Sequence, residues 1–367
     1  MFKGFRRIRE KADVIILIIM ILLVILGLAV LASASSSVSL EHFGHPYFYL
    51  QRQFFFIISL GLAGFLAGRF IPIRWLKKIS FPLLLTNLGL LVLVLTPLGG
   101  NFGTSNRWLE IAGIPFQPSE LLKITFIIYL ATWMTSKGKD RKNFSEGLLP
   151  FLILCGIVGG LLIAQPSTSI LVILLLSAGI VYFIGGLRFS FLAAIMGILA
   201  IALGVIITMT PYRMARITTF MHPEADPQKT GWHLSQSLMT IGSGGAFGVG
   251  YGNSVLKNSL PEPMNDTVFA IIAEEFGFVG SMFFIFLYFL LVIAGFLGSL
   301  QTRDVFGKLM LIGFSAVIGI QTFIHIASVS GLMPMTGMPL PFVSYGGTGI
   351  VALITVGGLM INILKHE

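Results

Sequence analysis

The chain has 367 residues, of which 55% are hydrophobic and only 11% are charged, and its formal net charge is +9. Soluble domains carry roughly 25% charged residues, so this composition excludes a soluble protein and indicates a polytopic membrane protein. The single cysteine, Cys155, excludes a disulfide within the chain. The basic residues lie in short loops between apolar segments, a pattern that reports membrane topology and argues against nucleic-acid binding.

A stretch of about 20 apolar residues crosses the hydrocarbon core of a bilayer, and this chain contains ten such stretches. We therefore predict an all-α integral membrane protein, a single polytopic domain of ten transmembrane helices. Most Lys and Arg residues fall on the side of the N-terminus, which places both termini in the cytoplasm. The predicted spans are about 14–32, 54–69, 80–97, 119–135, 148–165, 168–186, 188–209, 267–297, 306–328 and 342–364.

The longest connection, 210–266, joins the seventh and eighth predicted spans on the outer face. Long loops in compact domains are functional or disordered. Proline, glycine and charged residues are interspersed there with apolar ones, so we expect short helices over the membrane surface rather than disorder.

Ionisable residues inside spans mark functional sites or internal ion pairs. Glu120 and Lys123 are three residues apart, so they share one face of the fourth span. They would pair with each other, or Lys123 would meet an acid from another helix, for which Glu274 and Glu275 are the candidates. These two glutamates are adjacent and point about 100° apart on a helix, so only one of them can face a given partner.

Asp266 precedes the eighth predicted span. An aspartate in this position commonly caps a helix N-terminus, and a carboxylate at the outer mouth of the membrane region would equally serve as a general base. The residue types leave both roles open.

The glycine-rich segment 241–254, "IGSGGAFGVGYGNS", lacks the Gly-Lys-Ser/Thr of a nucleotide loop. Its backbone N–H groups would cradle a phosphate, or the segment would form a plain re-entrant turn. His222 and His233 are isolated in the sequence, which argues against a metal site built from them.

Several long motifs occur in an order that resembles the SEDS family, the polytopic cell-wall glycosyltransferases that include RodA, FtsW and SpoVE. The resemblance runs nearly from end to end, and the segment 331–347 is its most specific part. The motifs are "SAS" at 33–35, "NRWL" at 106–109, "FQPSE" at 116–120, "RITTF" at 216–220, "DPQKTGWHLSQS" at 226–237, "IGSGG" at 241–245, "PEPMND" at 261–266, "AEEFGFVG" at 273–280 and "GLMPMTGMPLPFVSYGG" at 331–347.

The chain departs from the family pattern at two places. The usual QPD turn reads Gln165-Pro166-Ser167, so no role of that acid can be carried over. Asn265 replaces the family's threonine, whereas the following Asp266 is kept. The assignment of Asp266 as the essential acid therefore survives.

The resemblance implies a peptidoglycan polymerase of the bacterial cytoplasmic membrane, with its active site facing outward. Such an enzyme joins the disaccharide units of lipid II, releases undecaprenyl pyrophosphate and works with a class B penicillin-binding protein. "DVFGK" at 304–308 and "AIIAEEFGF" lean towards the division type rather than the elongation type.

The resemblance and the predicted topology together assign roles to individual residues. Asp266 becomes the catalytic base, and Glu274 and Glu275, about two turns further along, become structural support that answers Lys123. The predicted pyrophosphate-binding residues are Arg107, Lys123, Arg213, Arg216, Lys257, Gln236, Ser243, Gly244 and Gly245. The predicted supporting residues are Trp108, Glu120, Glu262, Glu274, Glu275, Pro341 and Ser344. The sequence contains no dedicated metal site, although a divalent cation (Mg²⁺ or Mn²⁺) between carboxylate and pyrophosphate would suit this chemistry.

Two other functions fit a ten-span protein with internal charges. A lipid II flippase needs polar residues along a path through the bilayer, whereas the matched polar motifs cluster on the predicted outer side. A non-catalytic scaffold for the penicillin-binding protein would use the same outer loops as binding surfaces alone. An assay with a lipid-linked substrate separates both from an enzyme.

Overall fold

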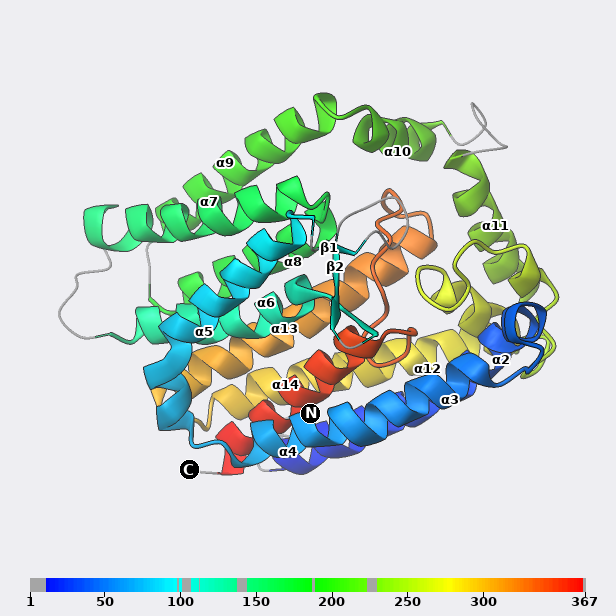
Figure 1. Cartoon of the computed structure of the whole chain (residues 1–367), viewed down its shortest axis with the longest axis horizontal. Helices are drawn as coiled ribbons and strands as arrows, with labels where there is room; N and C mark the ends of the chain where they lie inside the picture. The colour runs from blue at the N-terminus through cyan, green and yellow to red at the C-terminus, as the bar shows by residue number, and fades with distance from the viewer. Residues whose placement is uncertain are drawn as a thin grey trace.

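The computed structural model describes residues 11–97, 99–100, 107–111, 113–136, 144–186, 189–222 and 230–365. Within these ranges the chain is a bundle of long helices that run mainly along the longest axis of the molecule (Figure 1). The helices of the first half are α2 (Ala12–Phe43), α3 (Phe48–Phe56), α4 (Leu62–Phe70), α5 (Ile73–Val94), α6 (Pro118–Met134), α7 (Leu149–Ala164) and α8 (Thr168–Ile184). Those of the second half are α9 (Phe189–Thr208), α10 (Pro211–Met221), α11 (Thr230–Ser243), α12 (Val268–Ser299), α13 (Val305–Val329) and α14 (Gly347–Lys365).

Short irregular turns of helix connect some of these elements. The π-helical turn η1 (Ile57–Gly61) joins α3 to α4, so the second predicted span is one continuous helical segment. A second π-helical turn, η2 (Phe144–Leu148), leads into α7. The segment 210–266 contains α10, α11 and the 3₁₀ turn η4 (Leu256–Asn258).

Seven helical segments among the described residues are long and apolar enough to cross a membrane. They are Ala12–Phe43, Phe48–Phe70, Ile73–Val94, Phe144–Ala164, Val268–Ser299, Val305–Val329 and Gly347–Lys365. The shorter apolar helix α8 and the helices α6 and α9 coincide with the other three expected spans. All ten expected spans thus contain helix, while the number that cross the bilayer and the side of the termini stay predictions.

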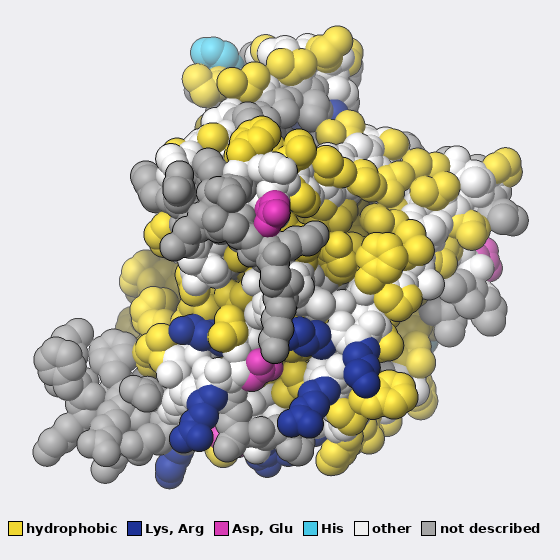
Figure 2. Space-filling model, turned by 90° about the vertical axis from the view of Figure 1, so that its left-hand side faces the viewer, with side chains coloured by type: hydrophobic (Ala, Val, Ile, Leu, Met, Phe, Trp, Pro, Cys, Tyr) yellow, Lys and Arg dark blue, Asp and Glu magenta, His cyan; other side chains and the backbone are white. Residues whose placement is uncertain are grey.

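Basic side chains gather at one end of the bundle, which Figure 2 shows facing the viewer. Arg69 lies in the last turn of α4, Arg74 in the first turn of α5, Arg303 in the connection from α12 to α13 and Lys365 at the end of α14. We call this the basic end and the opposite one the Asp266 end. The basic residues in 137–143 and Arg188, which also supported the predicted topology, lie outside the described residues.

A small antiparallel sheet, which the sequence did not predict, lies between α5 and α6. Its strands are β1 (Gly99–Gly100), β2 (Trp108–Ile111) and β3 (Ile114–Phe116), in the order β1-β2-β3. Leu109 pairs with Phe116, and Gly113 in the turn has the positive φ (+78°) that glycine adopts readily. The sheet is compatible with the helical fold class because it comprises only a few residues of a connection at the Asp266 end.

The centre of the bundle is α13, which packs against α12, α8 and α6 and is buried along most of its length. On one side α14 packs against α4, where glycines allow the two backbones to touch. A Cβ on Gly68 would lie 2.6 Å from the carbonyl oxygen of Thr355, and Gly358 meets the backbone of Phe65 in the same way. Such contacts between small residues are the usual basis of helix association in membranes.

Candidate active site

Asp266 lies in a short turn directly before α12. Its N–H donates to the carbonyl oxygen of Glu262 (3.2 Å), and the hydroxyl of Thr267 donates to the carbonyl of Pro261 (3.0 Å). Helix α12 begins at Val268, and its N-cap is Thr267, with no capping bond from a side chain. The alternative role of Asp266 as a helix cap is therefore wrong, and its carboxylate is left for another purpose.

The charged neighbours of Asp266 come from three separate segments. Burial raises the pKa of its carboxyl to about 6, and the negative charge of Glu262 adds to this rise. The positive charges of Arg216 and Arg107 oppose it. The structure thus brings together four of the predicted site residues: the acid, Glu262 and two arginines. A carboxyl with a pKa near neutral pH is suited to accept a proton.

Arg107 is anchored to the turn between α7 and α8. Its Nε donates to the carbonyl of Gln165 (3.1 Å), and its Nη2 donates to the carbonyl of Pro166 (2.6 Å). The Gln165 side chain in turn donates to the carbonyl of Leu91 on α5 (2.7 Å). The hydroxyl of Ser167, which stands where the family has an acid, donates to the carbonyl of Gln165 (3.2 Å). The turn is therefore held by neutral hydrogen bonds and one guanidinium.

Arg216 reaches the site from α10. Its Nη1 donates to the carbonyl of Met335 (3.0 Å), whereas Arg213, on the same helix, donates to the hydroxyl of Thr210 (3.1 Å). Partial burial and the charge of Arg216 lower the pKa of His233, and Glu262 opposes that shift. His233 on α11 is thus a neighbour of the site that the sequence treated as isolated. Its position becomes evident only when α10, α11 and the turn at 262 are packed together.

The segment 331–346 covers Asp266 from the other side. A Cβ on Gly337 would lie only 3.2 Å from Oδ2 of Asp266, and Gly337 has φ +68°. The Ser169 hydroxyl donates to the carbonyl of Thr336 (3.0 Å), and Nδ1 of His325 lies 2.5 Å from the carbonyl oxygen of Met338. Gly337, which the sequence did not single out, therefore sets how closely the backbone approaches the acid.

Pro341 and Ser344, two of the predicted supporting residues, complete this segment. The Ser344 hydroxyl donates to the carbonyl of Asn265 (2.8 Å), next to Asp266, and accepts from the N–H of Leu340 (2.8 Å). The hydroxyl of Tyr288 on α12 donates to the carbonyl of Pro341. Both residues thus tie the segment to α12 and to the turn that carries Asp266.

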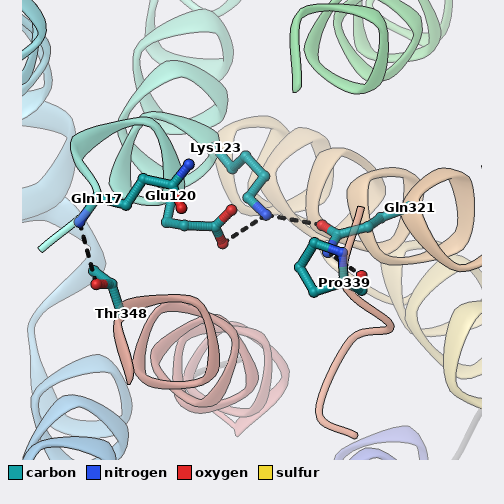
Figure 3. Close-up of polar contacts among 6 residues, drawn as sticks. All are labelled: Gln117, Glu120, Lys123, Gln321, Pro339 and Thr348. Atoms are coloured by element: carbon teal, nitrogen blue, oxygen red, sulfur yellow. Dashed lines mark hydrogen bonds and ion pairs between the residues drawn. The ribbon is translucent and has the colours of Figure 1, made fainter. Parts of the chain in front are cut away.

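Lys123 pairs with Glu120, and the expected pairing with Glu274 or Glu275 is wrong. Nζ of Lys123 lies 2.8 Å from Oε2 of Glu120 and donates to Oε1 of Gln321 on α13 (2.8 Å), as Figure 3 shows. The Gln321 side chain donates to the carbonyl of Pro339 (2.9 Å). Lys123 is only 3% exposed, so its predicted contact with pyrophosphate is replaced by a structural ion pair.

Lys123→Met is expected to destabilise the protein by about 3–5 kcal/mol, because it leaves the Glu120 carboxylate buried without its cation. Thermal unfolding of the detergent-purified protein measures the loss. A second change, Glu120→Gln, removes the orphaned charge and should restore most of the stability. Rescue by Glu274→Gln, with no rescue by Glu120→Gln, would contradict the pairing seen here.

Glu274 and Glu275 instead face α2 and the connection before η4. The Ser254 hydroxyl donates to Glu274, and the Ser33 hydroxyl of α2 donates to Glu275. Lys257, 9% exposed, donates from Nζ to the Ser33 hydroxyl (3.3 Å). The predicted pyrophosphate contact of Lys257 is therefore not supported, because its ammonium is buried in this second polar cluster. The two glutamates keep their predicted supporting role with a different partner.

The glycine-rich segment fills a break in α12. Gly277 has φ +67° and ψ −166°, which interrupts the helix just after the two glutamates. The N–H groups of Phe278 and Val279 donate to the carbonyls of Gly245 (2.9 Å) and Ala246 (3.1 Å). In return, the N–H groups of residues 249 and 250 donate to the carbonyls of residues 274 and 275 (2.9 and 3.1 Å). The segment thus replaces two missing helical hydrogen bonds.

This packing removes Gly244 from the predicted phosphate cradle. A Cβ on Gly244 would overlap the backbone of Ala273, so this glycine is needed for close contact with α12. The Ser243 hydroxyl donates to the carbonyl of Thr240 (2.8 Å) within α11. Gln236 lies one turn before Thr240 on α11, and its backbone carbonyl accepts a hydrogen bond from the Thr240 hydroxyl (2.8 Å). The plain re-entrant turn, our alternative, describes the segment better, while pyrophosphate contacts of Gln236, Ser243 and Gly245 stay predictions.

Two remaining expectations concern Trp108 and metal ions. Trp108 lies on β2, directly after Arg107, and pairs with Gly100 of β1, which fixes the strand next to the arginine. Among the described residues, no group of three or more His, Cys, Asp or Glu side chains is arranged to hold a metal ion.

Comparison with known proteins decides the family. The model of the FtsW, RodA and SpoVE family, described as cell cycle protein, matches residues 13–367. This chain belongs to the FtsW/RodA/SpoVE family. It is the SEDS family that the motifs indicated.

Relatives and solved structures agree with this SEDS assignment. The chain is 33% identical to the probable peptidoglycan glycosyltransferase FtsW of Geobacter sulfurreducens, over 96% of this chain and 95% of the relative. It is 36% identical to the Marinobacter nauticus protein of the same description, over 87% and 81%. A chain from a peptidoglycan synthase complex that coordinates polymerization and crosslinking superposes with a TM-score of 0.80 and 27% sequence identity. The superposition covers 96% of this chain and 97% of that chain. The rod shape determining protein RodA of Thermus thermophilus superposes with a TM-score of 0.69 and 28% sequence identity, over 96% of this chain and 95% of RodA.

Proposed function

We propose that this SEDS protein is a peptidoglycan glycosyltransferase that polymerises lipid II at the outer face of the bacterial cytoplasmic membrane. The observation that carries the proposal is the placement of Asp266, whose carboxyl has a pKa of about 6, within electrostatic reach of Arg107 and Arg216. Basic side chains at the opposite end of the bundle support an outward orientation of Asp266.

In the proposed reaction the 4-hydroxyl of the acceptor's N-acetylglucosamine attacks the anomeric carbon of the donor's N-acetylmuramic acid. The carboxylate of Asp266 takes the hydroxyl proton, the new glycosidic bond forms with inversion, and the bond to the pyrophosphate oxygen breaks. Undecaprenyl pyrophosphate leaves with the electron pair. Arg107 and Arg216 stabilise its growing charge, since guanidinium groups bind phosphate oxygens with paired hydrogen bonds.

Further parts of the proposal come from the relatives. FtsW-type relatives favour a role in division, and the synthase complex favours a class B penicillin-binding protein as the partner that crosslinks the strands. A divalent cation, Mg²⁺ or Mn²⁺, bound between the carboxylate and the pyrophosphate stays a prediction from the chemistry of the leaving group.

Reconstitution of the purified chain into liposomes with its partner transpeptidase tests the function. We expect glycan strands from lipid II, detected by gel electrophoresis after the transpeptidase is blocked with penicillin. Movement of labelled lipid II across the bilayer without polymer would favour the flippase. If the transpeptidase is bound but neither polymer nor movement of lipid II is detected, the scaffold would be favoured.

The polymerisation rate should fall as the pH is lowered through about 6. The pKa of Asp266 is raised to about 6, so the carboxylate that must accept the proton is fully present only above that pH. Well below it, the rate should drop about tenfold per pH unit. Initial rates between pH 5 and 8 in the same liposomes, at saturating lipid II, measure the profile. A flat profile across this range would contradict Asp266 as the base.

A further inference from the structure

The surface between α5 and α7 carries an apolar groove of about 690 Å³. Four residues of each helix line it, and all eight side chains are apolar or absent. Gly89 on α5 and Gly156 and Gly160 on α7 leave open space, because a Cβ on any of them would meet no atom within 4 Å. By contrast, Gly159 on the same helix packs against Leu171. The groove is therefore an open gap between α5 and α7, whereas α7 is packed against α8.

The groove leads towards the candidate active site. Its last residue on α7, Leu161, lies four residues before Gln165, which is about 6 Å along a helix. The Gln165 side chain bonds to the carbonyl of Leu91 and joins α7 to α5 at this level. Directly beyond it, Arg107 donates to the carbonyls of Gln165 and Pro166. The apolar groove thus ends close to the guanidinium of Arg107, whose positive charge also lowers the pKa of Asp266.

We propose that this groove holds the polyprenyl chain of the lipid-linked donor while its pyrophosphate lies beside Arg107. The inference rests on the proposed function and adds where the lipid part of the substrate lies. An anion with a single long hydrocarbon chain matches both parts of this site. Its negative charge would lie at the Arg107 guanidinium, and its hydrocarbon chain would lie in the uncharged groove. The branched isoprenoid chain fits the hollows at the three glycines through van der Waals contact.

The expected gain is modest and concerns orientation. A hydrocarbon chain is as well solvated by the bilayer as by an apolar groove, so burial alone contributes little. Shape-matched contact with the groove adds dispersion energy and fixes the direction in which the pyrophosphate leaves the membrane. Filling the groove should therefore displace the chain and weaken substrate binding without removing the acid or the arginines.

The test uses Gly160→Leu, with Gly204→Leu as the matched control. Gly204 lies on α9, is exposed and also has no neighbour for an added Cβ. Leucine favours helix over glycine, so neither change should harm folding. Undecaprenyl pyrophosphate with a diazirine on its chain is photolysed in liposomes with each variant, and the labelled peptides are identified by mass spectrometry.

We expect labels in 85–92 and 156–161, reduced roughly fivefold or more by Gly160→Leu and unchanged by Gly204→Leu. The KM for undecaprenyl lipid II should rise similarly, and that for an analogue with a single prenyl unit, which is too short to fill the groove, should stay within about twofold. Labels elsewhere, or insensitive to Gly160→Leu, would overturn the proposal. Loss of the partner transpeptidase from the Gly160→Leu variant would show a helix as occupant and also overturn it. If the native protein is labelled in the groove but forms no polymer, the groove is confirmed as a lipid site and the proposed function is refuted.

Discussion

Asp266→Asn should reduce lipid II polymerisation by about two to four orders of magnitude, the usual contribution of a general base. The amide has almost the size of the carboxylate but cannot accept the hydroxyl proton. The loss should appear in kcat with the partner transpeptidase still bound, because the arginines that hold the pyrophosphate are unchanged. Gel-based polymerisation assays on the reconstituted complex measure it.

Stability provides the control for this variant. The folded protein raises the pKa of Asp266 to about 6, so folding disfavours its charged form, and the stability that the carboxyl contributes is lost as the pH rises through about 6. The neutral amide removes that penalty at pH 7–8. Asp266→Asn should therefore unfold at the same or a higher temperature than the native chain. A normal polymerisation rate from this variant would refute the base assignment.

Glu262→Gln is the matched charge control. Glu262 lies next to Asp266 and raises its pKa, but the proposed reaction gives it no proton to carry. Removing its charge should lower the pKa of Asp266 and move the acid limb of the pH–rate profile to lower pH, with polymer still formed at pH 7–8. A loss as large as that of Asp266→Asn would place the base at Glu262 instead.

Gly277→Ala should destabilise the protein by at least about 3 kcal/mol. Gly277 combines φ +67° with ψ −166°, a region that only glycine occupies without strain. A Cβ there would lie 2.6 Å from the carbonyl oxygen of Ala246 and would overlap the N–H of Gly248. The change would therefore separate the glycine-rich segment from α12 and leave the exchanged hydrogen bonds unmade.

Gly242→Ala is the comparison for this variant. Gly242 lies on α11, is exposed, and a Cβ there would meet no atom within 4 Å. Alanine should leave stability unchanged or raise it by up to about 1 kcal/mol through helix propensity. Unfolding temperatures in the same detergent measure both variants. Equal stability of the two would contradict a structural requirement for glycine at 277.

The long helices could be predicted from the sequence because a span is a local property of composition. Every expected apolar run coincides with helix, and Asp266 could be picked out because a family motif contains it. The sheet was missed because β2 and β3 together offer too few residues for a periodic pattern. Its only local signals are the alternation in "WLEI" and the glycine of the turn.

Pairing partners could not be predicted because they depend on packing. Lys123 has one acid three residues away and two on another span, and spacing alone allows all three pairings. The break at Gly277 is equally hidden, since a single glycine in an apolar run reads as a small cost in helix propensity. The contact of Gly337 with Asp266 depends on His325, Gln321 and Ser169 holding the segment in place.

The exchange of hydrogen bonds at the break in α12 has a consequence for biogenesis. A helix that enters the bilayer with the N–H groups of Phe278 and Val279 unpaired would expose them to hydrocarbon, at several kcal/mol each. The segment 245–250 leaves the ribosome before α12 and supplies the missing carbonyls. Integration of α12 is therefore expected to be coupled to docking of the segment 245–250. The unit inserted into the membrane would then be the helix together with this segment.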